Sequence, residues 1–184
     1  MADIEAIATT YLEAELATHI QFGAAGDLLP TDYKHLQLRI SGKTVGLTYN
    51  DRFQVQFGYG TTPTFITSGY SFYYMIGALT VASAGTGLSQ TAINFYYLTS
   101  SIPAKYEAME YSTHIMDIRD YQNGSKNTTA TMTTCATPAQ TSVSGVCYGS
   151  GMVDDVRAVT AIKLSSVYAY WSRGTEVTLY GLKG

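Results

Sequence analysis

Few side chains in this sequence could carry acid–base chemistry. Of the three histidines, His114 is followed by two nearby carboxylates, Asp117 and Asp120. A histidine beside a carboxylate is a common general acid–base pair. On a regular strand, however, residues an odd number of positions apart point to opposite faces, so His114 and Asp117 would diverge. We therefore expect no catalytic residue, and a protein that is not an enzyme.

Two cysteines, Cys135 and Cys147, lie about a dozen residues apart. A disulfide between them would stabilise the fold by roughly 3 kcal/mol in the chain-entropy model. The alternative is a pair of free thiols, packed as small apolar side chains on neighbouring strands. No Cys-x-x-Cys motif and no nearby histidine accompany them, so we expect neither a metal site nor a cofactor.

The chain is rich in aromatic residues, with 16 Tyr, 6 Phe and 1 Trp. Tyrosine suits surfaces that are covered in a complex and wet when free. Pairs such as Tyr73–Tyr74 project to both faces of a strand, so one ring fills the core and the other needs a partner. We expect the outward tyrosine rings to form contacts within a homo-trimer, and the alternative is that they stack on a host glycan. The candidate partner or ligand surface comprises Tyr73, Tyr97, Tyr168, Tyr170 and Trp171.

The elements that position these side chains are expected to be strands. Leu36, Leu38 and Ile40 alternate with polar residues, as on a strand with one buried face. The same alternation runs through residues 53–59, whereas residues 72–79 and 93–98 are apolar throughout and indicate strands buried on both faces, or on one face and a subunit contact. Residues 113–118 and 128–134 are expected to pair across a turn at Asn123–Gly124.

The remaining segments predict two long loops, and an N-terminal segment whose sequence has both helix and strand features. Residues 58–71 and 137–155 are rich in Gly, Pro and Thr and indicate long loops. Residues 3–17 have the composition of a helix, but Thr9–Thr10–Tyr11 favours a strand over residues 7–11. The prediction is an all-β fold: an antiparallel β-sandwich or jelly-roll-like single domain over residues 1–184, with residues 1–6 as an arm.

Composition narrows the possible partners. Charged residues make up 14% of the chain, against about 25% in most proteins, and the net charge is −3. A nucleic-acid-binding domain normally carries a basic patch, so we expect no such partner. We also expect no membrane partner and no signal peptide, because the sequence has no apolar run of transmembrane length and no basic start followed by an apolar segment.

The sequence ends with Gly174, Thr175, Val177 and Leu179-Tyr180-Gly181, which match a pattern G-(S/T)-x-(F/V)-x-L-Y-G. This pattern, together with motifs at the start of the chain, resembles the small β-sandwich virion proteins of tailed bacteriophages, which typically end in this way. They open with strands of the types IATxxL, xxIxF and IPxxYxxLxLxI, which correspond here to residues 7–12, 18–22 and 29–40. The resemblance implies that residues 161–184 form a closing hairpin, with Val177 and Leu179 in the core. It also implies a structural role without catalysis.

The resemblance and the composition together give the expected function. We expect a capsid decoration (cement) protein that packs on other virion subunits, made in the host cytoplasm and located in the virion. The alternative is a receptor- or glycan-binding module of a tail fibre or tail tip.

Overall fold

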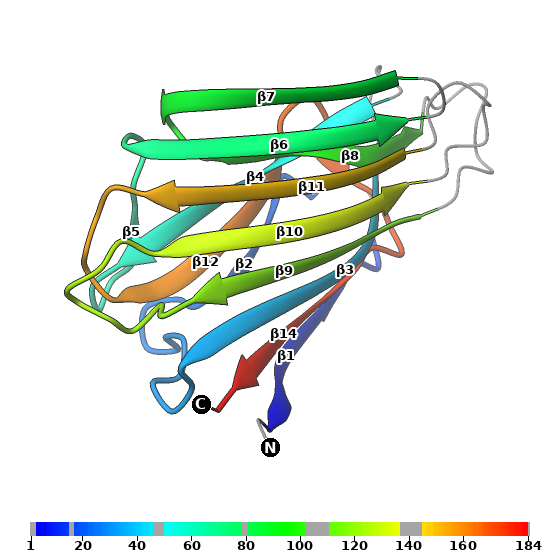
Figure 1. Ribbon diagram of the computed structural model, residues 1–184. Coiled ribbons are helices and arrows are strands. Elements are labelled where there is room, and N and C mark those ends of the chain that lie inside the picture. The colour runs from blue at the N-terminus through cyan, green and yellow to red at the C-terminus, as the bar shows by residue number, and fades with distance from the viewer. Residues whose placement is uncertain are drawn as a thin grey trace.

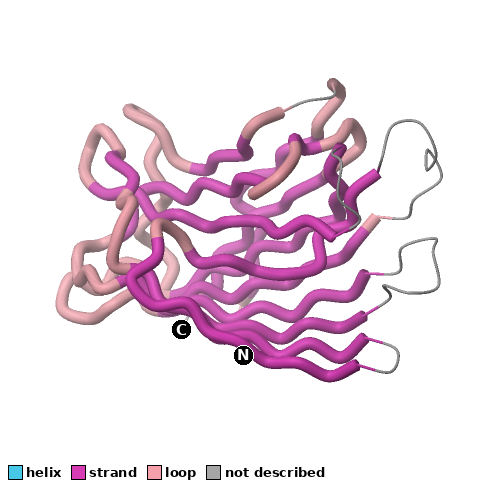
Figure 2. Tube along the Cα trace, turned by 90° about the horizontal axis from the view of Figure 1, so that it is seen from above, coloured by secondary structure: helices cyan, strands magenta, loops and turns pink. Residues whose placement is uncertain are grey.

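The computed structural model describes residues 3–14, 17–45, 50–78, 81–101, 111–136 and 145–183, and within these the fold is all-β, as predicted. Strands are the only regular element of the described residues (Figure 2), and no helix among them is long and apolar enough to cross a membrane. Antiparallel sheets pack as a sandwich-like domain, which confirms the expected fold class.

Eight strands form the larger layer, which we call the front sheet (Figure 1). Every neighbouring pair in it is antiparallel. In spatial order the strands are β1 (Ile4–Tyr11), β14 (Glu176–Leu182), β3 (His35–Val45), β9 (Ser112–Arg119), β10 (Thr129–Ala136), β11 (Gly145–Val153), β6 (Tyr70–Ala78) and β7 (Val81–Gln90).

The back sheet lies behind the front sheet and is smaller. It runs β2 (His19–Phe22), β12 (Val159–Ser166), β4 (Asn50–Tyr59) and β8 (Ile93–Ser101), and the two-residue strand β5 (Thr64–Phe65) pairs with β4. β3 connects the two layers. Its residues 35–42 pair within the front sheet, and its residues 43–45 pair in parallel with β8. The short strand β13 (Tyr170–Trp171) also pairs with this end of β3.

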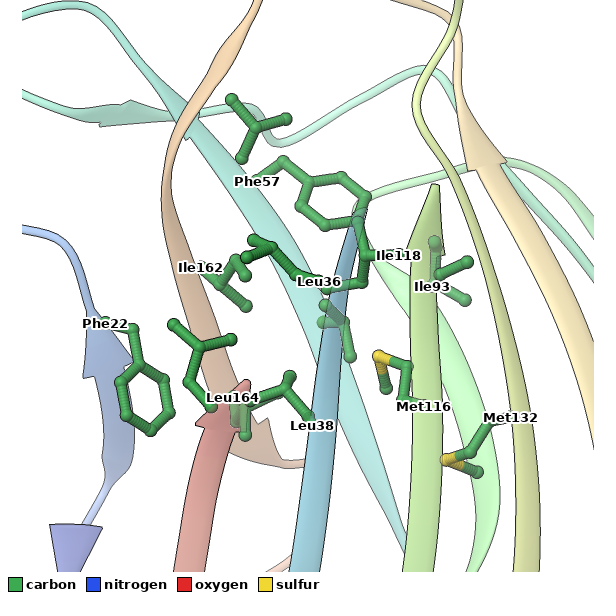
Figure 3. Close-up of a cluster of buried hydrophobic side chains, with 14 of the residues drawn as sticks. Phe22, Leu36, Leu38, Phe57, Ile93, Met116, Ile118, Met132, Ile162 and Leu164 are labelled. Atoms are coloured by element: carbon green, nitrogen blue, oxygen red, sulfur yellow. The ribbon is translucent and has the colours of Figure 1, made fainter. Parts of the chain in front are cut away.

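The core fills the space between the two sheets (Figure 3). β3 contributes Leu36, Leu38 and Ile40, which alternate with more exposed neighbours as the sequence predicts. The back sheet contributes the alternating residues of β4, Phe53, Val55 and Phe57, all with no exposed surface. Val177 and Leu179 of β14 are also fully buried, which confirms the core position predicted for them.

The structure corrects two predictions about the ends of the chain. The prediction of a closing hairpin is wrong. β12 pairs with β2 and β4, whereas β14 pairs with β1 and β3, so the two strands lie in opposite sheets. The expected strand at residues 7–11 is present but begins at Ile4. Residues 4–6 are therefore paired with β14 rather than forming an arm.

One predicted turn and two predicted loops also need correction. β9 and β10 pair as expected, but the residue with positive φ in their connection is Asp120, with a φ of 50°. Residues 145–153, expected within a long loop, form β11, while residues 137–144 lie outside the described part of the chain. The loop expected at residues 58–71 is shorter, since β4 extends to Tyr59 and β6 begins at Tyr70.

Candidate interaction surface

The outward face of the front sheet has a charged half and an uncharged half. In the charged half, β14, β3 and β9 direct Glu176, Arg39, Asp117 and Arg119 outward. The strands β10, β11, β6 and β7 contain no charged residue. We call the outward side chains of these four strands the uncharged face. It comprises Thr129, Thr131, Thr133, Cys135, Val146, Tyr148, Ser150, Met152, Ser71, Tyr73, Met75, Gly77, Ala82, Ala84, Thr86 and Leu88.

The sequence of β11 explains why large side chains point outward here. Its inward positions include Gly149 and Gly151, which are buried, and its outward positions include Tyr148 and Met152. A Cβ atom at Gly151 would lie 2.5 Å from Ile93, and one at Gly149 would lie 2.9 Å from Phe95. The glycines therefore let β8 pack against the backbone of β11. As a result the small residues of this strand face the core and its larger ones face solvent.

The exposed apolar side chains of the uncharged face are contiguous. Tyr148 lies opposite Met75 in the register of β11 and β6, and Ser150 lies opposite Tyr73. The exposed fractions are 59% for Tyr73, 60% for Met75, 60% for Leu88, 53% for Val146 and 47% for Tyr148. A shallow groove of about 340 Å³ lies between Tyr73, Leu88 and Met152. A contiguous apolar patch of this kind is typical of a binding surface.

The charged half is organised by side-chain hydrogen bonds. Gln37 Nε2 donates to Asp117 Oδ1 at 2.8 Å, and Arg39 Nε donates to Gln37 Oε1 at 2.9 Å. The Arg39 guanidinium also lies 4.6 Å from the centre of the Tyr180 ring, a cation–π contact. Asp117 and Arg39 therefore already have partners within the chain, in contrast to the exposed apolar side chains of the uncharged face.

The five candidate surface residues do not lie together. Tyr73 is on the uncharged face. Tyr168 is 52% exposed and lies between β12 and β13, and Tyr170 is 46% exposed and lies in β13. Trp171 is fully buried, which corrects its assignment to the surface. Its ring packs 6.3 Å from that of Phe53, and its Nε1 donates to the Leu164 carbonyl oxygen. Tyr97 belongs to β8, but its side chain lies outside the described part of the structure.

Cys135 and Cys147 are not joined by a disulfide. They lie on adjacent strands, but Cys147 pairs with Thr134 and Cys135 pairs with Val146. The offset of one residue sends Cys147 into the core and Cys135 to solvent. Of the two interpretations of the sequence, thiols without a disulfide on neighbouring strands is correct, but only Cys147 is buried as that interpretation expects.

His114 and Asp117 diverge, as expected from their spacing. His114 is fully buried; its Nδ1 lies 2.8 Å from Thr134 Oγ1, and its Nε2 lies 2.8 Å from Ser112 Oγ. Burial lowers the pKa of this imidazole to about 3, so it is neutral at ordinary pH. Asp117 faces outward and accepts from Gln37. In the described residues, no group of three His, Cys, Asp or Glu side chains could hold a metal ion.

No family model and no curated protein matches this chain. Among solved structures, it is weakly similar to alginate lyase A1-II', a member of polysaccharide lyase family 7. The identity is 12% and the TM-score 0.26, and the match covers 82% of this chain and 66% of the lyase chain.

Two weak structural similarities are to proteins of phages and viruses. One is to the CBM2 module of the evolved Dit of Lactobacillus casei BL23 phage J-1, with 10% identity and a TM-score of 0.28 over 96% of this chain and 77% of that chain. The other is to the VP2 subviral particle of infectious bursal disease virus, with 10% identity and a TM-score of 0.18 over 98% and 41%. Because all three TM-scores are below 0.5, these similarities carry no argument about function.

Proposed function

We propose that this chain is a non-enzymatic structural protein of a tailed-bacteriophage virion, a capsid decoration (cement) protein that binds other virion subunits. The observation that carries the proposal is the uncharged face, where four adjacent strands expose Tyr73, Met75, Val146 and Tyr148 without a single charged side chain. The sequence resemblance at both ends of the chain supplies the class of partner.

The composition of the uncharged face is that of the buried centre of a protein interface. Such centres are enriched in Tyr and Met and depleted of charged residues. Covering Met75, Tyr148 and their neighbours would remove apolar surface from water, at about 25 cal/mol per Å². Salt screens charges and not apolar contacts, so binding through this face depends only weakly on ionic strength.

A second candidate function is a receptor- or glycan-binding module of a tail fibre or tail tip. The observation that favours it is the groove on the uncharged face, where the Tyr73 ring lies beside the Ser71, Thr131 and Ser150 side chains. A tyrosine ring offers a flat apolar surface with a polar tip, and the hydroxyl groups can donate and accept hydrogen bonds with a sugar.

A pair of lysine variants tests the proposed function. Purified protein should bind particles that lack it and raise their resistance to heat. Tyr148→Lys should weaken this binding tenfold or more, because an unpaired charge would be buried at the interface. Tyr168→Lys is the matched control, since Tyr168 is similarly exposed but lies outside the uncharged face. Its affinity should stay within about twofold of the wild type. Co-sedimentation with particles measures both.

Three outcomes would contradict the proposal. One is the absence of binding to particles of any composition, and another is an equal effect of the two lysine substitutions. The third is binding to host envelope or purified surface glycan with none to particles, which would support the second candidate function instead.

A further inference from the structure

β7 is an edge strand of the front sheet as the structure describes it. It is ten residues long, ends the spatial order of the front sheet, and pairs with β6 alone among the described strands (Figure 1). In an antiparallel pair, every second residue directs its N–H and C=O groups away from the neighbour. The free side of β7 therefore presents a row of backbone donors and acceptors that the described strands of this chain leave unpaired.

The features that usually prevent edge-to-edge pairing are absent from residues 81–87 of β7. Natural edges are blocked by charged side chains, by proline, by bulges or by short length, and residues 81–90 contain neither charge nor proline. The one shift in its register lies near Gln90, so residues 81–87 pair regularly with β6.

Two other edge strands, one in each sheet, are blocked. β1 of the front sheet carries Glu5, which forms an ion pair with Lys183 at 3.3 Å, and its pairing is interrupted between Ala6 and Ala8. β2 of the back sheet has only four residues. The two edges of the front sheet therefore differ, with β1 blocked and β7 bare among the described strands.

The side chains of β7 leave room for a second strand. Those at its centre are small: Ala82, Ser83, Ala84, Gly85 and Thr86. On the inner face, the Tyr74 ring lies over Gly85 and the Phe72 ring lies over Gly87, and the two rings stack with centroids 6.4 Å apart. The rings cover the glycines from β6, which is a known way of stabilising glycines at a sheet edge.

We propose that β7 pairs with β7 of a second copy of this chain, antiparallel about a two-fold axis, and so joins two front sheets into one. A two-fold contact uses the same strand on both sides, which requires that like groups tolerate one another. β7 meets this requirement because β7 and the three strands next to it carry no charge, so the net charge of −3 lies elsewhere. The product is a dimer with a doubled uncharged face, rather than the trimer expected from the tyrosine content. The proposal of a β7–β7 dimer does not depend on binding to a virion.

Two lysine variants on one cross-strand row of the front sheet test this contact. Ala84 of β7 lies opposite Met75, which lies opposite Tyr148, which lies opposite Thr133 of β10. Ala84 and Thr133 are both exposed and both point outward. Ala84→Lys places two like charges at the proposed contact, whereas Thr133→Lys places the same charge on the same face three strands away.

Sedimentation equilibrium of the purified chain at micromolar concentration provides the readout. The wild type and Thr133→Lys should have twice the 20.0 kDa mass of one chain, and Ala84→Lys should be monomeric. Hydrogen exchange should show that those backbone amides of residues 81–87 that point away from β6 are protected in the wild type and unprotected in a folded Ala84→Lys. A monomeric or trimeric wild type, or an Ala84→Lys variant that is still dimeric, would overturn the proposal. Because no particle is present, these results are separate from the test of virion binding.

Discussion

Leu179→Ala is expected to lower the free energy of unfolding by about 2–5 kcal/mol, the usual cost of truncating a buried leucine. Leu179 has no exposed surface and lies in β14, between Ala8 of β1 and Leu38 of β3. Removing its side chain leaves a cavity where the front sheet packs on the core. Denaturant unfolding, followed by intrinsic fluorescence of the buried Trp171, measures the change.

Leu88→Ala is the matched control for Leu179→Ala, because the same atoms are removed from a side chain that is 60% exposed. It should change the free energy of unfolding by less than about 0.5 kcal/mol. A loss below about 1 kcal/mol in Leu179→Ala would show that β14 contributes little to the core.

Stability is expected to fall as the pH is lowered from 6.5 to 5, by roughly 2 kcal/mol, because of His114. Burial lowers the pKa of His114 to about 3, whereas an unfolded histidine has a pKa of about 6.5. Between these values the unfolded chain binds a proton that the native chain excludes, so acid favours unfolding. Protonation of Glu5 and Asp155 affects stability at lower pH. A hydrogen bond from Tyr33 lowers the pKa of Glu5, and one from Arg157 lowers the pKa of Asp155.

His114→Gln isolates this effect. Glutamine can donate and accept hydrogen bonds to Ser112 and Thr134 but does not titrate, so the pH dependence between 6.5 and 5 should largely disappear, whatever the absolute stability of the variant. His19→Gln, at an exposed position, should keep the wild-type dependence. Denaturant unfolding at a series of pH values measures how the free energy of unfolding of each protein changes with pH. An equal change for the wild type and His114→Gln would show that His114 is not a neutral imidazole in the core.

Strands with one polar and one apolar face were predictable from the sequence. The alternation in β3 and β4 gave the correct inward residues, because the buried face of each strand is lined by large apolar side chains such as Leu38 and Phe57. The pairing of β9 with β10 was also predictable. The position of the residue with positive φ between these strands was not predictable. The connection is nine residues long, and its residue with positive φ is Asp120, at its start.

The uncharged face was only partly predictable, for a physical reason. β11 and β7 place glycine at inward positions where strands usually place large apolar residues, and their composition therefore resembles that of a loop. The side chains that cover these glycines come from other strands: Ile93 and Phe95 from β8, and Tyr74 and Phe72 from β6. That complementarity exists only once the strands are packed. The apolar character of residues 72–79 was the one local signal, and its outward residues Tyr73 and Met75 proved to be exposed.

Oxidative footprinting of the protein on assembled particles shows whether the uncharged face is covered there. Tyrosine and methionine side chains react readily with hydroxyl radicals when exposed, and the uncharged face contains both. We expect Met75, Tyr73 and Tyr148 to react in the free protein and to be protected on the particle, while Tyr168 and Tyr170 react equally in both states. Equal reactivity of Met75 and Tyr148 in the free and particle-bound protein would contradict the proposed function, because the uncharged face would then be open to solvent in the assembly.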